Sequence, residues 1–339
     1  MTAGAHPSLY IMVGGLETGK QGPTPEEISI VRSKESLLVY ALRVDQEIFP
    51  MVKNGEGKSY IGDVWGRPGE KQILLDAAGE NLLTSIVRER RIPAMVFGEQ
   101  NHYPLFEGRP HVVRYNDSLD NSSQYRRGKR TGVYSVTGDY TPEGIPLGAV
   151  CVNIRDREAT LTLGSDNYII DLSDPELKHV RLPEAPRRKT FKDDEDLTIA
   201  TFQGEKKYKL MFDRHFQQLV EALHPKAFID SGGGSYIYSE LASGTTDIYI
   251  MFNEPHSEIL PGLPAALAAK CTVISVNQDG TYSDYRANPD FLSSPEEYSH
   301  GNVPLFIASR TPELAEEAIG YYMRANNVPG EPRRLKIAA

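Results

Sequence analysis

A change of hydropathy pattern near the middle of the chain is the feature that most limits its fold. Before this change, apolar residues recur in short runs separated by turn sequences such as the one at 141–144. The runs cover residues 132–136, 147–154, 159–163 and 168–172. Short apolar runs bounded by turn residues are typical of antiparallel strands. The first half is therefore predicted to contain an antiparallel sheet.

The second half alternates apolar strands with helical patterns. Strands are predicted at 197–202, 248–252, 271–276 and 305–309, and helices at 212–223, 261–269 and 312–324. Such alternation is typical of an α/β lobe. A polar, Pro-rich stretch at 183–196 separates the two patterns and is interpreted as a linker. The fold class is therefore α+β or α/β, built as two lobes.

The N-terminal part of the chain has a helical pattern after a Gly- and Pro-rich start. Within that start, residues 14–21 nearly match a nucleotide-binding loop, but no Ser or Thr follows Lys20 and Pro23 would break the helix that the motif must open. We therefore treat the match as coincidental. The predicted organisation is an arm at 1–28, a helix-plus-antiparallel-sheet lobe at 29–182, the linker at 183–196, an α/β lobe at 197–326 and a tail at 327–339.

Composition narrows the classes of partner. The chain of 339 residues carries a formal net charge of −9, which argues against nucleic acid as a partner. Cys151 and Cys271 are the two cysteines, so no disulfide framework is implied. No secretory leader and no apolar run of about 18 residues is found. We expect a cytoplasmic protein that binds a small molecule and neither nucleic acid nor a membrane, and a homodimer stays open.

The segment Asn116–Tyr125 (NDSLDNSSQY) carries the most chemical information. Asp117 and Asp120 stand three residues apart, and the Ser122 hydroxyl follows two residues later. Two carboxylates this close repel each other unless they are protonated or bridged by a cation. Mg²⁺ prefers carboxylate oxygens together with substrate phosphate. We interpret the segment as a short polar turn at the edge of a Mg²⁺-dependent phosphate site, although such a pair alone is more often a solvated turn.

Further acids occur in suitable places elsewhere. Asp76 and Glu80 lie four residues apart in a predicted helix, Glu99 ends the apolar strand at 96–99, and Glu258 follows the strand at 246–252 where a helix of small residues opens. These segments supply the additional carboxylates that a site for more than one cation requires.

Together these segments resemble the inositol monophosphatase-like superfamily, which includes inositol phosphatases, fructose bisphosphatases and bisphosphate nucleotidases. Its signatures are an Asp-x-x-x-Glu helix, a Gly-Glu-Glu strand end, an Asp-x-x-Asp segment and a late acid at a helix start. The resemblance covers about residues 30–325, and the form Asp-x-x-Asp-x-x-x-Gln-Tyr-x-x-Gly is most similar to inositol polyphosphate 1-phosphatases. It implies a layered αβαβα sugar-phosphatase fold with an antiparallel N-terminal sheet and a mixed C-terminal sheet.

The resemblance also implies a role for each matching residue. Two or three Mg²⁺ ions would be bound by Glu99, Asp117, the Leu119 carbonyl, Asp120 and Glu258. Asp76 and Ser122 would be the catalytic pair that orients the attacking water. The phosphate would be held by Asn121, Ser122 and Ser123 at a helix start. No histidine is required, because metal-bound water is already acidic.

Several positions depart from the family pattern. Gln100 replaces the second glutamate of Gly-Glu-Glu, Ser118 replaces a proline, and Asn121 replaces Gly or Ser. Asparagine tolerates a left-handed backbone better than most residues, so the last change is expected to fit. Met251 stands where monophosphatases have a glutamate that contacts inositol, and this change argues against plain inositol monophosphate as the substrate.

Two segments are candidate substrate contacts. Arg126 and Arg127 open a basic run through residue 130, which is either a site for a second anionic group or a solvated loop. Gly233, Gly234, Ser235 and Tyr236 match a family segment beside the substrate, and a flexible turn is the alternative. The stretch 277–302 is either a lid or a decorated loop.

The sequence thus predicts a Mg²⁺-dependent phosphomonoesterase acting on a small polyol, sugar or nucleotide phosphate. A bisphosphate nucleotidase or an inositol polyphosphate phosphatase is the alternative within the class. A catalytically silent, sugar-phosphate-binding or regulatory relative is the alternative outside it.

Overall fold

The computed structural model describes residues 24–63, 71–98, 102–105, 108–128, 132–182, 190–191, 197–203, 206–223, 227–230, 232–277, 279–294, 297–298 and 301–328. The near-match to a nucleotide-binding loop, the predicted metal ligand Glu99 with the adjacent Gln100, most of the predicted linker and most of the tail lie outside these ranges.

The described chain opens with a long helical segment whose start is fixed by a side-chain cap. The Thr24 hydroxyl accepts the Glu27 amide at 3.2 Å, and the Glu27 carboxylate accepts the Thr24 amide at 2.7 Å. Reciprocal capping of this kind satisfies amides that have no partner inside the helix. Helix α2 (Pro25–Arg43) continues through a π-helical turn, η1 (Val44–Ile48), into α3 (Phe49–Asn54), and left-handed Gly55 ends the segment. The helix therefore includes residues 25–28, which were predicted to belong to the arm.

The first sheet has eight strands in the order β10-β9-β8-β7-β6-β5-β3-β4. All neighbouring strands are antiparallel except β3 and β5. The strands are β3 (Ala94–Phe97), β4 (His102–Pro104), β5 (Val112–Asp120), β6 (Tyr134–Tyr140), β7 (Pro146–Asn153), β8 (Glu158–Leu163), β9 (Asp166–Asp171) and β10 (His179–Arg181). A separate ribbon pairs β1 (Tyr60–Asp63) with β2 (Lys71–Ile73) and leads into α4 (Leu74–Glu89).

The second sheet has six strands in the order β12-β11-β13-β16-β14-β15 and mixes parallel with antiparallel pairs. Its strands are β11 (Leu197–Ala200), β12 (Ala227–Asp230), β13 (Ile248–Pro255), β14 (Thr272–Val276), β15 (Tyr282–Asp284) and β16 (Asn302–Ser309). The remaining helices are α5 (Ser122–Arg126), α6 (Lys206–Leu223), α7 (Ile237–Ser243), α8 (His256–Ile259), α9 (Leu263–Ala268), the 3₁₀ helix η2 (Pro289–Leu292) and α11 (Pro312–Ala325).

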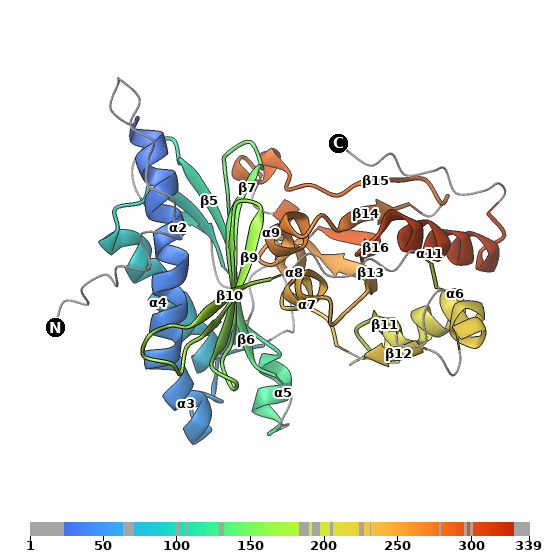
Figure 1. Cartoon of the computed structure of the whole chain (residues 1–339), viewed down its shortest axis with the longest axis horizontal. Coiled ribbons are helices and arrows are strands. Elements are labelled where there is room, and N and C mark those ends of the chain that lie inside the picture. Colours follow the sequence, from blue (N-terminus) through green and yellow to red (C-terminus); the bar gives the residue numbers. More distant parts are fainter. Residues whose placement is uncertain are drawn as a thin grey trace.

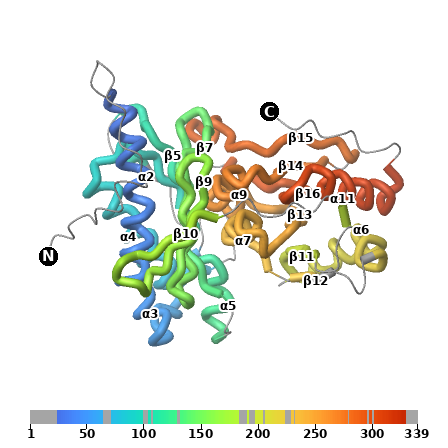
Figure 2. Tube along the Cα trace, in the orientation of Figure 1, coloured from blue at the N-terminus to red at the C-terminus, as the bar shows by residue number. Residues whose placement is uncertain are grey.

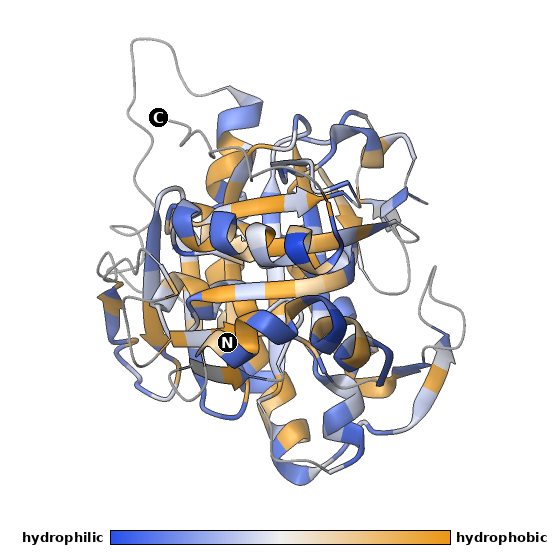
Figure 3. Cartoon of the chain, turned by 90° about the vertical axis from the view of Figure 1, so that its right-hand side faces the viewer, coloured by the Kyte–Doolittle hydropathy of each residue, from blue (hydrophilic) through white to orange (hydrophobic). Residues whose placement is uncertain are grey.

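The elements stack in five layers. Helices α2 and α4 cover one face of the eight-stranded sheet, α7, α8 and α9 lie between the two sheets, and α6 and α11 cover the far face of the second sheet (Figure 1). The colour sequence of Figure 2 places the first half of the chain on one side and the second half on the other. Apolar residues concentrate on the strands inside these layers (Figure 3). The layering confirms the predicted αβαβα fold and the mixed second sheet, and the first sheet is antiparallel as predicted except for the parallel pair of β3 and β5.

A buried ion pair fastens α2 to the strand that carries the acid motif. Arg114 of β5 and Asp139 of β6 are fully buried and bonded to each other, and the Arg114 guanidinium also donates to the Ser36 hydroxyl of α2 at 2.7 Å. The Ser33 hydroxyl of α2 donates to Asp139. A buried charge requires such satisfied partners. The network therefore fixes β5 against the helix layer next to Asp117.

Candidate metal centre

The acid motif lies on a strand, and the prediction of a short polar turn is wrong. All nine residues of β5 are buried, and the turn begins only at Asn121. Polar residues suggested a solvated turn, but here they line the interface between the layers. Asn121 has φ of 68°, so the expected left-handed asparagine is confirmed. Helix α5 follows directly, with Ser122 and Ser123 in its first turn.

An irregularity in β5 brings the two aspartates to one side. Asp117 pairs with Val136 of β6 and Asp120 pairs with Tyr134, so three steps along β5 match two along β6. In a regular strand, residues three apart face opposite sides of the sheet. The extra residue of a bulge restores a common side. The spacing of the motif and the bulge are therefore parts of one arrangement.

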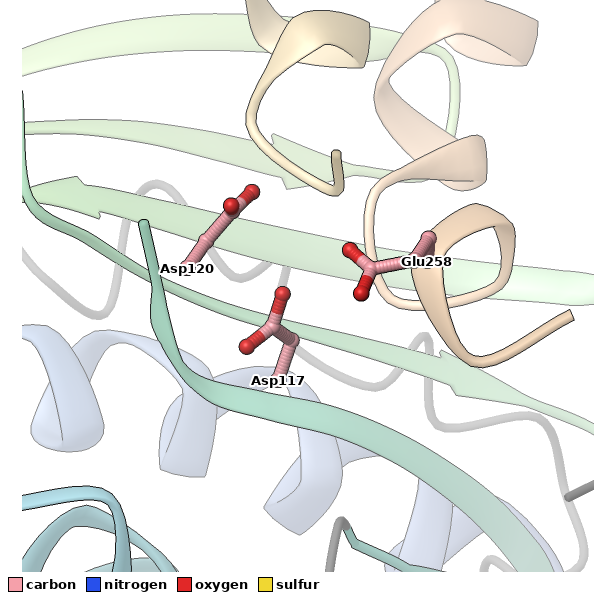
Figure 4. A group of neighbouring side chains, drawn as sticks. All are labelled: Asp117, Asp120 and Glu258. Atoms are coloured by element: carbon pink, nitrogen blue, oxygen red, sulfur yellow. The ribbon is translucent and has the colours of Figure 1, made fainter. Parts of the chain in front are cut away.

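The third carboxylate comes from the other lobe. Ligand oxygens of Asp117, Asp120 and Glu258 all lie within 4.8 Å of one another. Asp117 and Asp120 extend from β5 and Glu258 from α8, and the three carboxylates point into a shared space (Figure 4). Burial, and then the charge of Glu258, raise the pKa of Asp120 well above its ordinary value. A hard divalent cation would remove this conflict, and an all-carboxylate donor set suits Mg²⁺.

The glycine-rich segment lies against this cluster. The Tyr236 amide donates to Asp120 Oδ2 at 3.0 Å, and the Ser235 hydroxyl donates to the Glu258 carbonyl at 3.1 Å. Gly234 has φ of 115°, and a Cβ there would lie 2.6 Å from both carboxylate oxygens of Asp120. Gly233, Gly234 and Ser235 are buried, so the segment forms a packed wall of the acid cluster in the turn that leads into α7. Its predicted contact with substrate stays a prediction.

Sequence reasoning missed one residue of this wall. Tyr134 of β6 stacks on Tyr236, with ring centroids 4.1 Å apart and planes 3° from parallel. The stacked pair joins the two lobes beside Asp120. Nothing in the hydropathy pattern distinguishes Tyr134 from an ordinary strand aromatic, so only pairing with β5 could have indicated it.

The predicted catalytic pair is placed at two helix starts. Asp76 lies in the first turn of α4, is 1% exposed, and accepts the Ile73 amide at 2.8 Å. Gly79, one turn later, packs so closely on Ser118 that an added Cβ would lie 3.1 Å from the serine Cβ. The start of α4 therefore packs against β5 at Ser118. Ser122 is half-buried at the start of α5, and its pairing with Asp76 stays a prediction.

Two predicted ligands are not settled by the described residues. Glu99 lies outside them, although β3 ends nearby at Phe97, which pairs with Tyr115 of β5. The side chain of Leu119 is 1% exposed and packs in the apolar core, while the role of its carbonyl stays a prediction. The Glu80 carboxylate lies so close to Gly98 that an added Cβ there would displace it.

The residues considered for substrate binding differ in exposure. Arg126 and Arg127 are exposed, and the Arg126 guanidinium lies 4.7 Å above the Tyr60 ring of β1. Met251 is 4% exposed and belongs to the apolar core between the sheets. Tyr238, two residues beyond Tyr236, is fully buried in that core.

Other reactive side chains have structural roles. His256, near Glu258 in sequence, contacts the Tyr285 hydroxyl at 2.6 Å, and burial lowers its pKa to about 4. Cys151 and Cys271 are buried free thiols. The stretch predicted as a lid or loop at 277–302 contains the short strand β15 and the helix η2, with Phe291 buried.

No protein-family model and no curated protein sequence matches this chain. Solved structures do match it. A dual-specific IMPase/NADP phosphatase bound with D-inositol-1-phosphate is 12% identical, with 90% of this chain and 99% of that chain covered at a TM-score of 0.59. CysQ from Bacteroides thetaiotaomicron, a bacterial member of the inositol monophosphatase family, is 16% identical, with 82% and 97% covered at 0.54. An inositol monophosphatase from Zymomonas mobilis is 14% identical, with 88% and 99% covered at 0.53.

These likenesses place the chain in a structural class. Its fold is that of these inositol monophosphatase and CysQ structures, which confirms the fold that the sequence motifs implied. Among the described helices, none is long and apolar enough to cross a bilayer.

Proposed function

We propose that this protein is a Mg²⁺-dependent phosphomonoesterase that hydrolyses a small polyol, sugar or nucleotide phosphate. The observation that carries the proposal is the convergence of Asp117, Asp120 and Glu258 within 4.8 Å at the interface of the two lobes. Buried acids this close conflict with one another unless a proton or a cation compensates them. The likeness in fold to phosphatases supports the choice of reaction.

The proposed role of each residue follows from its position in the fold. Bound Mg²⁺ would offset phosphate charge and supply a water of lowered pKa. Asp117, Asp120 and Glu258 would hold the ions, joined by Glu99 and the Leu119 carbonyl. Asp76 and Ser122 would orient the attacking water. Asn121, Ser122 and Ser123, where α5 follows the acid strand, would bind the phosphate, so positioning and charge account for most of the catalysis.

The substrate is expected to differ from plain inositol monophosphate. Met251 is buried in the apolar core and brings no carboxylate to the position where the family resemblance implies a glutamate that contacts inositol. The exposed guanidinium groups of Arg126 and Arg127 favour a substrate with a second anionic group. A bisphosphate nucleotidase or polyphosphate phosphatase is therefore the alternative within the class. No nucleic acid or membrane is part of the proposal, the expected location is cytoplasmic, and a homodimer stays open.

Release of inorganic phosphate with Mg²⁺ tests the proposal. The panel contains inositol phosphates, sugar mono- and bisphosphates and 3'-phosphorylated nucleotides. Asp117→Asn is the matched control, because it keeps the size of the side chain and removes its charge. We expect turnover of at least one compound by the wild type and a loss of at least 100-fold in the variant, as for groups that stabilise transition-state charge. Equal turnover by both proteins would refute the role of Asp117. Absence of turnover together with measurable Mg²⁺ binding would favour the silent relative.

A further inference from the structure

Strand β13 places two buried polar side chains behind the glycine-rich segment. Tyr249 is 0% exposed and Glu254 is 1% exposed. The Tyr249 hydroxyl donates to Glu254 Oε1 at 2.8 Å. Burial and the nearby Glu254 carboxylate raise the pKa of Tyr249 well above its ordinary value, so the phenol remains a donor. A donor and an acceptor satisfied in this way form a rigid unit inside an apolar core.

This pairing depends on a backbone distortion. Residues five apart on a strand face opposite sides of the sheet. Asn253 has φ of 53°, which lies in the left-handed region and interrupts the alternation. As a result Glu254 turns toward Tyr249, and the amide of Asn253 instead reaches Met211 of α6 on the other side of the sheet, with Nδ2 3.9 Å from Sδ. The distortion therefore adds a carboxylate to the side that faces the acid cluster.

The same phenol supports the glycine-rich segment. Its oxygen accepts the Gly234 amide in a long hydrogen bond of 3.4 Å. A Cβ at Gly233 would lie 2.9 Å from that oxygen, so the backbone rests directly on Tyr249. The segment in turn contacts Asp120 through the Tyr236 amide and the Glu258 carbonyl through the Ser235 hydroxyl.

We propose that Tyr249 and Glu254 are positioning residues for the metal centre. They hold the backbone of Gly233 and Gly234 in a fixed position. The glycine-rich segment then sets the distance between Asp120 of one lobe and Glu258 of the other. Neither side chain touches the metal or the substrate in this arrangement. The inference rests on the proposed function, because it assumes that the three carboxylates bind a divalent cation.

Titration of the metal-free full-length protein with Mn²⁺ by isothermal calorimetry tests the inference without an activity assay. Tyr249→Phe removes the hydroxyl and keeps the ring, and we expect its Kd for Mn²⁺ to rise about 10-fold, as for other partners that orient metal ligands. Glu254→Gln keeps an oxygen that accepts from Tyr249, so its Kd should stay within about 2-fold of the wild type. The matched control is Tyr40→Phe, which removes an equally buried hydroxyl bonded to Ser135 at 2.7 Å.

The outcomes separate positioning from plain structural support. Weaker Mn²⁺ binding in Tyr249→Phe, with a melting temperature of the metal-free protein like that of Tyr40→Phe, would support the inference. Unchanged binding in Tyr249→Phe, or equal weakening in Tyr40→Phe, would overturn it. If Tyr249→Phe fails to fold, Ser235→Ala replaces it, and wild-type affinity in that variant would likewise overturn the inference. If the wild type does not bind Mn²⁺, or Asp117→Asn binds it equally well, the proposed function fails instead.

Discussion

At the scale of single residues, the surroundings of Asp120 explain most of the candidate site. Its carboxylate is buried, close to another acid, and met by backbone amides rather than by a basic side chain. The amides of Tyr236, Asn121 and Ser235 oppose the rise in its pKa but do not prevent it. Amide donors hold the carboxylate in place but bring no full positive charge, which a bound cation would supply.

Gly234 should tolerate no side chain, because of both its backbone and its neighbour. Gly234→Ala would place a methyl group against the Asp120 carboxylate at a φ of 115°. Gly164→Ala is the matched control, since Gly164 also has positive φ, at 63°, but faces open space. We expect the control to lose about 1 kcal/mol of unfolding free energy, and Gly234→Ala to lose about 1–3 kcal/mol more.

Urea unfolding of both variants measures these losses of unfolding free energy. In Gly234→Ala alone we also expect weaker Mn²⁺ binding, which titration with Mn²⁺ measures. Equal losses in the two variants, with unchanged Mn²⁺ affinity, would contradict the close packing at Asp120.

Some features of individual residues could be predicted from the sequence, and others could not. The left-handed backbone of Asn121 was predictable, because few other residue types adopt it. The acids Asp117, Asp120 and Glu258 were recognisable together through spacing and family resemblance. Tyr134, Tyr249 and the reversal at Asn253 were not, since their roles arise only from contacts across strands that are distant in sequence.

At the scale of elements, hydropathy patterns located most helices and strands of the described chain. The predicted strands at 147–154 and 159–163 agree with β7 and β8, and the predicted helix at 312–324 agrees with α11. The main error is the acid segment, predicted as a turn and found as the end of β5. Polar side chains are typical of turns, and a hydropathy pattern does not distinguish solvation from burial in a binding site. The bulge that orients the aspartates left no signal in the sequence.

Helix α7 carries a carboxyl group that should make stability depend on pH. Burial chiefly, and then Asp230, raise the pKa of Glu240 to about 7, although the Thr246 hydroxyl donates to it. A carboxyl whose pKa is raised in the folded state favours folding at low pH, and this benefit is lost as pH rises through about 7. Glu240→Gln should remove this loss because its side chain does not ionise.

Urea unfolding at pH 5 and pH 8 measures the effect. Between these values the wild type should lose about 2 kcal/mol relative to Glu240→Gln. Comparison of the two proteins cancels the titration of all other groups. Parallel pH profiles would show that Glu240 is ionised in the folded protein throughout.

At the scale of the whole molecule, the acid cluster joins two lobes that the chain builds in succession. The first sheet supplies Asp117 and Asp120, and the second lobe supplies Glu258 together with the segment that contacts both sides. The change in hydropathy pattern predicted the mainly antiparallel strands of the first half and the alternation of strands and helices in the second, while the mixed second sheet was implied by the family resemblance. The relative placement of the lobes was not, because it depends on apolar packing between residues far apart in sequence.

Mg²⁺ should therefore stabilise the molecule as a unit. A ligand that binds only the folded state adds about 2.7 kcal/mol at 100 times its Kd. We expect Mg²⁺ to raise the melting temperature followed by near-ultraviolet circular dichroism, which reports on aromatic residues in both lobes. Asp117→Asn should show no such rise. An equal rise in the variant would mean that Mg²⁺ binds elsewhere.

The bulge in β5 also makes the three-residue interval between Asp117 and Asp120 a structural requirement. An odd spacing between two residues on one face of a sheet requires an irregular strand, so the three-residue interval and the distortion must be inherited together. Removing one residue between Asp117 and Asp120 would permit a regular strand with an even interval, but it would also shift every following residue, including the start of α5. The motif therefore requires a fixed number of residues between Asp117 and Asp120. Substitutions within it are accommodated more readily than insertions or deletions.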